Sequence, residues 1–345
     1  MADRTDLPLK IGGGFGSPYS LKMRAVLRYR HIPFQWIPRD SEWDDLAPVK
    51  VKLMPTFGFP NADGVYDESM VDSTPIIDRL EISYPERSLV PTDAVVAFLD
   101  YLIEDFGDEW MTKMMYHYRW HYPEAVDKAG RLLPLDHNLQ MSDEVWRGGV
   151  KYITDRQVSR MALVGSTPEN TPVVEASYRR TLHLLDAIIS QRNFLLGNRP
   201  GRGDFAAYGQ LSQLVLWDPE STRIAIAEAP RVVTWTMRMD DPSWIPVTHN
   251  EGWLTRDLVD APLLDLLKEM GHIYAPFLLA NAEAHHKGEE TFSIELDGRR
   301  YSQGTFVYQV KCLKWLREKY AALNDRDRAD LDAILQGTGC ERLFS

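Results

Sequence analysis

Short apolar runs and one amphipathic stretch alternate at the start of the chain. Residues 21–27 have the apolar spacing of a helix, and residues 34–37 alternate as a strand does. Ser17 precedes the helix as an N-cap, and Pro18 suits its first position because a proline needs no amide partner there. The pattern predicts a β-α-β unit in which a glycine-rich segment, residues 12–16, precedes the helix.

The next hundred residues change from turn signals to helices. An Asp63-Gly64 turn follows Met54-Pro55-Thr56, and Asp72 or Ser73 then caps a helix with a proline in its first turn. Residues 84–91 have the composition of a linker, which predicts a first unit over 1–91. Residues 95–240 are mostly helical in pattern, so we expect a second, all-helical unit over 92–255.

The last ninety residues predict a third unit, 256–345. A helix near 262–283 comes first, then a hairpin with an Asp297-Gly298 turn, then a helix over 305–323. The inward residues expected in the hairpin are Phe292, Ile294 and Leu296, and those expected in the last helix are Phe306, Val310, Leu313 and Tyr320.

Composition and charge limit the classes of partner. The chain has 345 residues, 44% of them hydrophobic, and a net charge of −11 from 39 basic and 50 acidic residues. This balance works against nucleic acid and acidic membranes as partners. Only Cys312 and Cys340 are present, so neither a disulfide framework nor a cysteine-rich metal site is expected. No signal peptide and no apolar run long enough to span a membrane is apparent, which predicts a cytoplasmic protein.

Candidate chemistry begins at Ser17. A helix that starts there offers free amide donors and a partial positive charge, which would suit an anion such as a thiolate. The sequence Ser17-Pro18-Tyr19-Ser20 resembles the Cys-Pro-Tyr-Cys redox motif of glutaredoxins with both thiols replaced by hydroxyls. With both cysteines absent, disulfide exchange is disfavoured.

Three separated segments together resemble cytosolic glutathione transferases of the serine type, over about the first two-thirds of the chain. They are Ser17 at the strand-to-helix junction, Met54-Pro55-Thr56 as the Val-Pro-x-Leu step, and residues 72–81 as the Glu-Ser-x-x-Ile segment. The resemblance implies an α/β thioredoxin-like N-terminal domain, an all-α C-terminal domain and a mostly helical extension with a β-hairpin. It also implies a homodimer, and glutathione as cosubstrate without a metal.

The resemblance assigns roles to individual residues. Pro55 would be cis, with the backbone of Met54 paired to the glutathione cysteine. Asp72 would take the γ-glutamyl amine, and Ser73 its carboxylate. Lys52 or, second, Arg39 would meet the glycyl carboxylate.

Ser17 would then act as a hydrogen-bond donor to the thiolate of glutathione. A free thiol has a pKa near 8.5, and lowering it by about two units needs roughly 2.7 kcal/mol. A hydroxyl donor and the helix dipole can supply this. Ser20 is the alternative if the junction is shifted by one turn.

The electrophile pocket is expected on the first long helix of the second unit. Tyr19, Met115, Tyr116 and Trp120 are the candidate wall, and the alternative is that the aromatic run 114–122 is packed core. His117 and His121 have the i, i+4 spacing of a metal pair but no acidic partner between them, so no metal is expected.

A helix-entry box in the second unit carries a departure from the family pattern. Asp204 lies three residues after Gly201, where the family has Ser or Thr, so the hydroxyl cap is missing while Asp204 can still bind the turn. The leading hypothesis is an enzyme that activates glutathione for attack on an apolar electrophile. Non-catalytic binding or scaffolding, or another glutathione-dependent activity (lyase, isomerase or peroxidase), are the alternatives.

Overall fold

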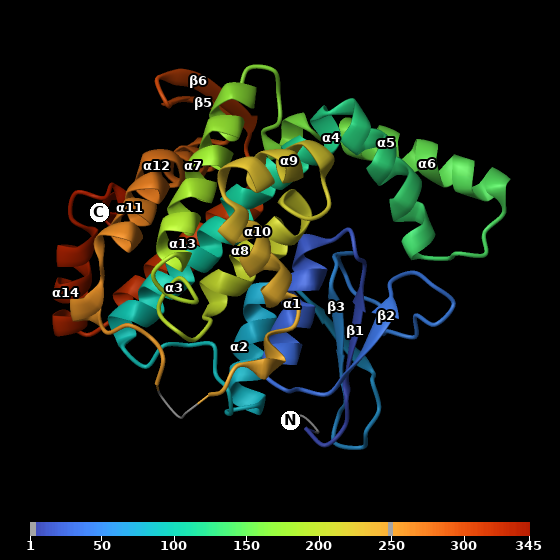
Figure 1. The fold of residues 1–345 in the computed structure, drawn as a ribbon, viewed down its shortest axis with the longest axis horizontal. Coiled ribbons are helices and arrows are strands. Elements are labelled where there is room, and N and C mark those ends of the chain that lie inside the picture. The colour runs from blue at the N-terminus through green and yellow to red at the C-terminus, as the bar shows by residue number, and fades with distance from the viewer. Residues whose placement is uncertain (1–4, 248–250) are drawn as a thin grey trace.

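A four-stranded sheet forms the N-terminal unit in the computed structural model, which describes residues 5–247 and 251–345 (Figure 1). The strand order is β2-β1-β3-β4, with β1 parallel to β2 and the other neighbours antiparallel. The strands are β1 Leu9–Gly13, β2 Phe34–Pro38, β3 Thr56–Phe59 and β4 Glu68–Val71. Helix α1, Pro18–Tyr29, connects the parallel pair, and α2, Ser73–Ser83, follows β4.

The helical unit is built around α8. Its helices are α3 Ala94–Phe106, α4 Thr112–His121, α5 Pro123–Leu132, α6 Asp143–Val158, α7 Thr171–Ile189, α8 Arg202–Leu214, α9 Pro219–Glu228 and α10 Pro230–Met239. Every residue of α8 is buried, because α1 packs on one side of it and α3 on another. A π-helical turn, Gly107–Met111, joins α3 to α4, and 3-10 turns occupy Leu133–Asp136 and Ala162–Val164.

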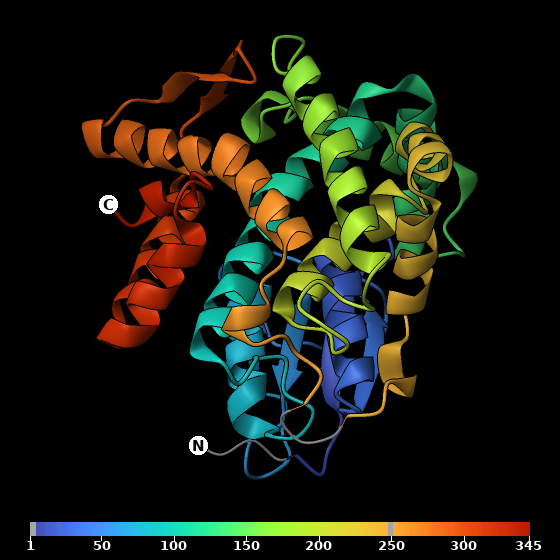
Figure 2. The same ribbon diagram turned by 60° about the vertical axis from the view of Figure 1, so that its left-hand side comes forward.

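The C-terminal extension packs against the helical unit along α3 and α7 (Figure 2). A short turn at Pro242–Trp244 ends the helical unit. The elements of the extension are a short turn at Arg256–Leu258, α11 Ala261–Glu269, a π turn Met270–Tyr274, α12 Ala275–Lys287, β5 Thr291–Leu296, β6 Arg299–Gly304, α13 Val307–Ala321, α14 Asp325–Leu335 and a final turn Cys340–Leu343. Helix α13 runs alongside α3, which brings residues from opposite ends of the chain together.

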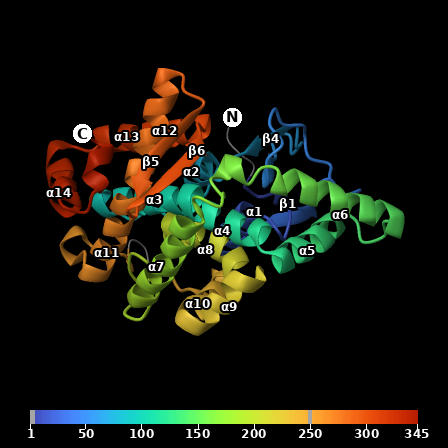
Figure 3. The same ribbon diagram turned by 90° about the horizontal axis from the view of Figure 1, so that it is seen from above.

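The α5–α6 hairpin projects from the rest of the molecule (Figure 3). No residue of α6 is buried. The turn that follows α5 reaches back to the N-terminal unit, where the Phe15 amide donates to Asp136 Oδ2 at 2.7 Å. The hairpin therefore covers the loop that precedes α1.

The predicted fold class is confirmed: a thioredoxin-like unit, a helical unit and an extension that contains a β-hairpin. The predicted helix at 262–283 is instead α11 and α12 joined by a π turn, ending at Lys287, and α14 was not predicted. No described helix is long and apolar enough to cross a bilayer. Residues 1–4, part of the N-terminus in which no signal peptide was recognised, lie outside the described residues.

The predicted apolar stripe of α13 is confirmed in part: Leu313 is buried and Tyr320 packs against the core, but the buried face is centred elsewhere. Its buried side chains are Gln309, Cys312, Leu313 and Leu316, whereas Phe306 just before the helix is 38% exposed. Two of the buried side chains, Gln309 and Cys312, line a cavity, so a half-polar face turns inward here. Apolar periodicity alone does not predict such a face.

Candidate functional site

Ser17 occupies the N-cap of α1 with an extended backbone, φ −101° and ψ 115°. Its hydroxyl oxygen accepts a hydrogen bond from the Ser20 amide at 3.2 Å, and its proton is left for donation. The Ser20 side chain is fully buried and accepts from the Gly14 amide at 3.4 Å. Because Ser17 is half-buried and Ser20 is enclosed, exposure favours Ser17 as the hydroxyl that a ligand can reach.

The loop before Ser17 is tied to the helical unit. Arg119 donates to the carbonyl of Gly16 at 2.6 Å, and Gln213 donates to the carbonyl of Phe15 at 3.2 Å. Arg119 is itself buried and paired with Asp218 at 3.0 Å. These contacts fix the approach to α1 from the side of α4 and α8.

The Met54-Pro55 peptide bond is cis and leads directly into β3. Lys52, two residues earlier, has a side chain that is 83% exposed and 4.0 Å from Asp40 Oδ1. The alternative, Arg39, is nearly buried and paired with Asp44. Of these two cations, Lys52 is the one without a buried partner.

Asp72 and Ser73 stand at the start of α2. Asp72 has φ 83°, an uncommon value for a residue with a side chain, and its carboxylate does not cap the helix. Instead Oδ2 accepts from the Tyr308 hydroxyl at 2.9 Å and lies 3.8 Å from Lys311 Nζ. Burial raises the pKa of Asp72, although Tyr308 and Lys311 act in the opposite direction. The extension therefore contacts the residue expected to bind the γ-glutamyl amine.

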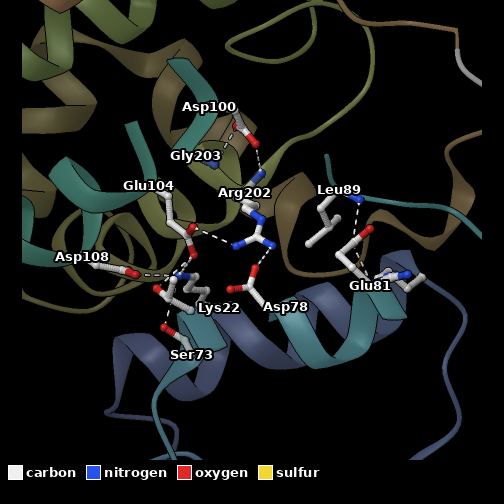
Figure 4. A network of polar contacts seen from close by, with 12 residues as sticks. Lys22, Ser73, Asp78, Glu81, Leu89, Asp100, Glu104, Asp108, Arg202 and Gly203 are labelled. Atoms are coloured by element: carbon white, nitrogen blue, oxygen red, sulfur yellow. Dashed lines mark hydrogen bonds and ion pairs between the residues drawn. The ribbon is translucent and has the colours of Figure 1, made fainter. Parts of the chain in front are cut away.

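Ser73 contacts a buried ionic network (Figure 4). The ammonium of Lys22 donates to Ser73 Oγ at 3.2 Å, to Glu104 at 2.9 Å and to Asp108 at 2.6 Å. Arg202 pairs with Asp78 and lies 3.5 Å from Glu104. Burial opposes the ionisation of Glu104, but the charges of Lys22 and Arg202 outweigh it and hold its pKa below the usual value. The network joins α1, α2, α3 and α8 at one point.

A cavity of about 450 Å³ opens between the N-terminal unit, the π turn and α13. The N-terminal unit contributes five residues of the predicted site to its lining: Tyr19, Met54, Pro55, Asp72 and Ser73. Ser17 and Lys52 lie outside this lining. The structure thus brings the cis-proline step and the start of α2 together at the cavity, whereas Ser17 is not among the residues that line it.

Four acidic residues reach the cavity from α3 and the π turn. They are Glu104, Asp105, Asp108 and Glu109. The π turn inserts one extra residue per turn, a distortion often found at functional sites. Burial raises the pKa of Asp105 to about 7, of Asp108 to about 6 and of Glu109 to about 8. Burial also lowers the pKa of Lys113, on the next turn, to about 7.

The expected pocket wall on α4 lies elsewhere. Met115 and Trp120 are buried, and the Tyr116 hydroxyl donates to the carbonyl of Gln157 in α6 at 2.8 Å. These three side chains are outside the cavity lining, so they take the packed position that was the alternative. Tyr19 alone of that set lines the cavity, and its hydroxyl donates to the carbonyl of Asp108 at 2.6 Å.

His117 is engaged by protein groups. Its ring nitrogens lie 2.8 Å from Ser166 Oγ and 3.2 Å from Glu175 Oε1, and its ring stacks on that of His121. Burial lowers the pKa of His117 to about 4, so the ring is neutral at pH 7. Within residues 5–247 and 251–345, no group of three or more His, Cys, Asp or Glu side chains is arranged to hold a metal ion.

The Gly201 departure has a structural explanation in Asp100. The Asp204 carboxylate accepts from the amides of Gly201 at 3.0 Å and Leu195 at 2.9 Å. The Asp100 carboxylate, from α3, accepts from the amides of Arg202 and Gly203, both at 2.9 Å. A Cβ at residue 201 would collide with Asp100. Asp100 therefore supplies the cap that a Ser or Thr would give, and leaves no room for one.

The sequence analysis missed the residues of α13 that complete the cavity: Tyr308, Gln309, Cys312 and Trp315. Lys311 was missed as well. No local signal marks these side chains as site residues. The acids of α3 and the π turn did have a signal, because residues 104, 105, 108 and 109 share one helix face within an otherwise apolar stretch.

Residues 15–88 match the family model described as the N-terminal domain of glutathione S-transferase. No curated protein matches the chain. Among solved structures, a glutathione S-transferase from Methylobacterium radiotolerans in complex with glutathione sulfonate is 17% identical, with 70% of this chain and 97% of that chain covered and a TM-score of 0.42. A glutathione transferase family member from Pseudomonas fluorescens with two glutathione bound is 16% identical, with 68% and 92% covered and a TM-score of 0.42. The Tau class glutathione S-transferase from mango, Mangifera indica, is 16% identical, with 70% and 94% covered and a TM-score of 0.40.

Proposed function

Because the chain carries a glutathione S-transferase N-terminal domain, we propose that it binds glutathione and activates its thiol for attack on a second substrate. The proposal rests on one observation: residues of the predicted site lie together at one cavity. Met54-Pro55 and Asp72-Ser73 come from two separate segments of the N-terminal unit, and all four residues line the same cavity. A binding site for an extended tripeptide needs such contacts spread along one groove.

Each end of glutathione would meet a group of matching chemistry. The backbone of Met54 would pair with the cysteinyl residue, and Asp72 would accept from the γ-glutamyl ammonium. The γ-glutamyl carboxylate would bind Ser73 and the free amides at the start of α2. The buried ammonium of Lys22, 3.2 Å from Ser73 Oγ, orients that hydroxyl and adds a positive charge behind it. Lys52 would meet the glycyl carboxylate from the solvent side.

The thiolate would be stabilised at the start of α1. Ser17 has a proton to donate, and the free amides and dipole of α1 favour a negative charge there. A pKa lowered by about two units makes most of the thiol ionised at neutral pH. The sulfur would then attack an electrophilic carbon and displace its leaving group, with the bond to carbon formed by the sulfur lone pair.

Helix α13 would act as a wall on the γ-glutamyl side. Tyr308 and Lys311 contact the same carboxylate oxygen that the ligand ammonium would use. An incoming ammonium therefore shares Asp72 with Tyr308 or displaces its hydroxyl. This arrangement limits how tightly glutathione can bind until α13 adjusts.

Non-catalytic glutathione binding is the second candidate function. Two observations favour it: Ser17 lies outside the cavity lining, and Tyr308 and Lys311 already engage Asp72. In this alternative the cavity binds glutathione, but no hydrogen-bond donor stabilises the thiolate of the bound glutathione. Measured turnover distinguishes the two functions.

The test combines binding and activity. Calorimetry with glutathione is expected to give saturable binding to the wild type, at least tenfold weaker binding to Asp72→Asn, and unchanged binding to the control Asp63→Asn, an exposed carboxylate in the same unit. Turnover of an aryl halide should fall at least tenfold in Ser17→Ala while glutathione still binds. Absence of binding would remove both functions, and binding without turnover would leave only the second.

Three further features are proposed, the homodimer on the family resemblance alone and the other two also on sequence composition. They are the division of the chain at about residues 91 and 255, a homodimeric state and a cytoplasmic location. Limited proteolysis, sedimentation equilibrium and cell fractionation would test them in turn.

A further inference from the structure

The acidic end of the cavity has more carboxyl groups than cations to pair with them. Lys22 pairs with Glu104 and Asp108, and Lys311 lies near Asp72. Across the described part of the chain, no cation lies within 4.0 Å of the Asp105 or Glu109 carboxyl groups. Asp105 accepts only from neutral donors such as the Tyr274 hydroxyl at 2.6 Å. Two carboxyl groups therefore face the cavity without a counter-ion.

Lys113, one turn after Glu109, does not supply that counter-ion. Its ammonium donates to Gln303 Oε1 at 2.9 Å and lies over the Phe277 ring at 4.3 Å. The side chain is thus drawn toward the β5–β6 side of the cavity. Lys113 therefore lies beyond ion-pair distance of the Glu109 carboxyl group, although the charges of the two groups still interact.

Among the described residues, four buried polar atoms of the cavity lining have no hydrogen-bond partner. They are Glu104 Oε2, Asp108 Oδ1, Gln303 Nε2 and Gln309 Oε1, and Glu104 Oε2 still lies 3.5 Å from Arg202. Asp108, Gln303 and Gln309 are only 6%, 4% and 2% exposed, so bulk water is largely excluded from them. A buried group without a partner is costly, and Asp108 Oδ1 and Gln309 Oε1 are acceptors. These two atoms call for a ligand that donates hydrogen bonds.

We propose that this end of the cavity binds a protonated amine attached to an apolar body, and that such a compound, with an electrophilic carbon and its leaving group on the apolar body, is the second substrate. The ammonium would lie among Asp105, Asp108 and Glu109 and would donate to Asp108 Oδ1 and Gln309 Oε1. This assignment rests on the proposed function, because it names the class of compound that bound glutathione would attack.

The opposite wall suits the apolar body of such a compound. Leu53, Met54, Phe306 and Trp315 line the cavity between the cis-proline step and α13. An anion placed at the acidic end would meet the carboxyl groups of Asp105, Asp108 and Glu109, so a carboxylate should not bind there.

The experiment compares three probes of one shape: 2-phenylethylamine, 2-phenylethanol and phenylacetate. Calorimetry on the full chain at about pH 8, where the amine is still charged, should show binding of the amine at least tenfold tighter than of the alcohol and none of the carboxylate. Glu109→Gln and Asp108→Asn should each weaken amine binding about tenfold. Glu144→Gln, an exposed carboxylate on α6, should leave it unchanged.

The outcomes separate this inference from the proposed function. Equal binding of the three probes, or amine binding that neither cavity variant weakens, would overturn the inference. Glutathione is titrated into the same samples. If glutathione binds and the amine does not, the inference is overturned and the proposed function is kept. Amine binding without glutathione binding would overturn the proposed function and, with it, the role of the amine as a second substrate. Thermal unfolding of each variant checks that the fold is retained.

Discussion

The hydroxyl of Tyr308 donates a hydrogen bond to Asp72 Oδ2 at 2.9 Å, which links the extension to the start of α2 across 236 positions of the sequence. Lys311 lies 3.8 Å from the same oxygen. The carboxylate that the family resemblance assigns to glutathione is therefore already in contact with the chain itself. Glutathione binding and the position of α13 must be coupled.

Replacing Tyr308 by Phe should increase glutathione affinity. The substitution removes the hydroxyl that competes with the ligand ammonium for Asp72 and keeps the ring that lines the cavity. A net gain near 1 kcal/mol corresponds to roughly three- to tenfold tighter binding, measured by calorimetry. Tyr320→Phe is the control, because that hydroxyl donates to Asp332 at an exposed site on the same helix. Weaker binding in Tyr308→Phe would show that the hydroxyl supports the site.

Replacing Lys22 by Met should destabilise the fold strongly. The change leaves Asp108 and Glu104 buried with less compensating charge, which costs about 3–5 kcal/mol in buried ion pairs. Chemical denaturation measures the free energy of unfolding. The loss should shrink at acidic pH, where the two carboxyl groups become protonated. Lys151→Met, on the exposed face of α6, should cause no measurable change. A similar effect of both substitutions would refute a special role for the network.

Replacing Asp100 by Ala should weaken the start of α8. Asp100 accepts from two helix amides, and the loss of an N-cap costs about 1–2 kcal/mol. The free energy of unfolding should fall by about 2 kcal/mol in denaturant titration. Asp127→Ala, which removes an exposed pair with Arg131, is the matched control. If Gly201→Ser rescued Asp100→Ala fully, the hydroxyl would be shown to fit once the carboxylate is gone.

The buried acids predict a pH dependence of stability with a definite sign. Burial raises the pKa of Glu109 from 4.5 to about 8, so the native state binds this proton more tightly than the unfolded chain. Stability from this group is fully present below about pH 4.5 and is lost as the pH rises toward about 8. Glu109→Gln should remove a slope of up to about 1.4 kcal/mol per pH unit in the free energy of unfolding.

Several ionisable groups lie close to Glu109, and they also contribute to the pH dependence of the free energy of unfolding. The titratable and polar groups that face Glu109 are Tyr19, Asp105, Asp108, Lys113, Tyr274, Tyr308, Gln309 and Cys312. Wild type and Glu109→Gln must therefore be compared over the same range in the same buffers. Parallel curves for the two proteins would contradict the assignment.

Local signals explain which parts of the structure could be predicted from the sequence. The α1 start at Ser17-Pro18 and the β5–β6 hairpin each follow from neighbouring residues, and both are present. The hairpin turn has positive φ at Asp297 and Gly298, the backbone shape that an Asp-Gly pair favours. Structural features that depend on a few neighbouring residues can therefore be predicted from the sequence.

Long-range contacts explain the rest. The cap of α8 comes from Asp100, 102 positions before Arg202, and the cavity wall comes from α13. Apolar periodicity identified α13 as a helix and placed Leu313 correctly, but it missed Gln309 and Cys312 on the buried side. The expected pocket residues Met115, Tyr116 and Trp120 are close in sequence to the acids that do line the cavity, and the π turn directs the acids inward instead.

A crystal structure of the protein soaked with glutathione tests the central claim most directly. The account predicts density in the cavity, with the γ-glutamyl ammonium within hydrogen-bond distance of Asp72, the cysteinyl backbone paired with Met54, and the sulfur directed toward Ser17. Glutathione bound outside this cavity, or its sulfur directed away from the start of α1, would contradict the account.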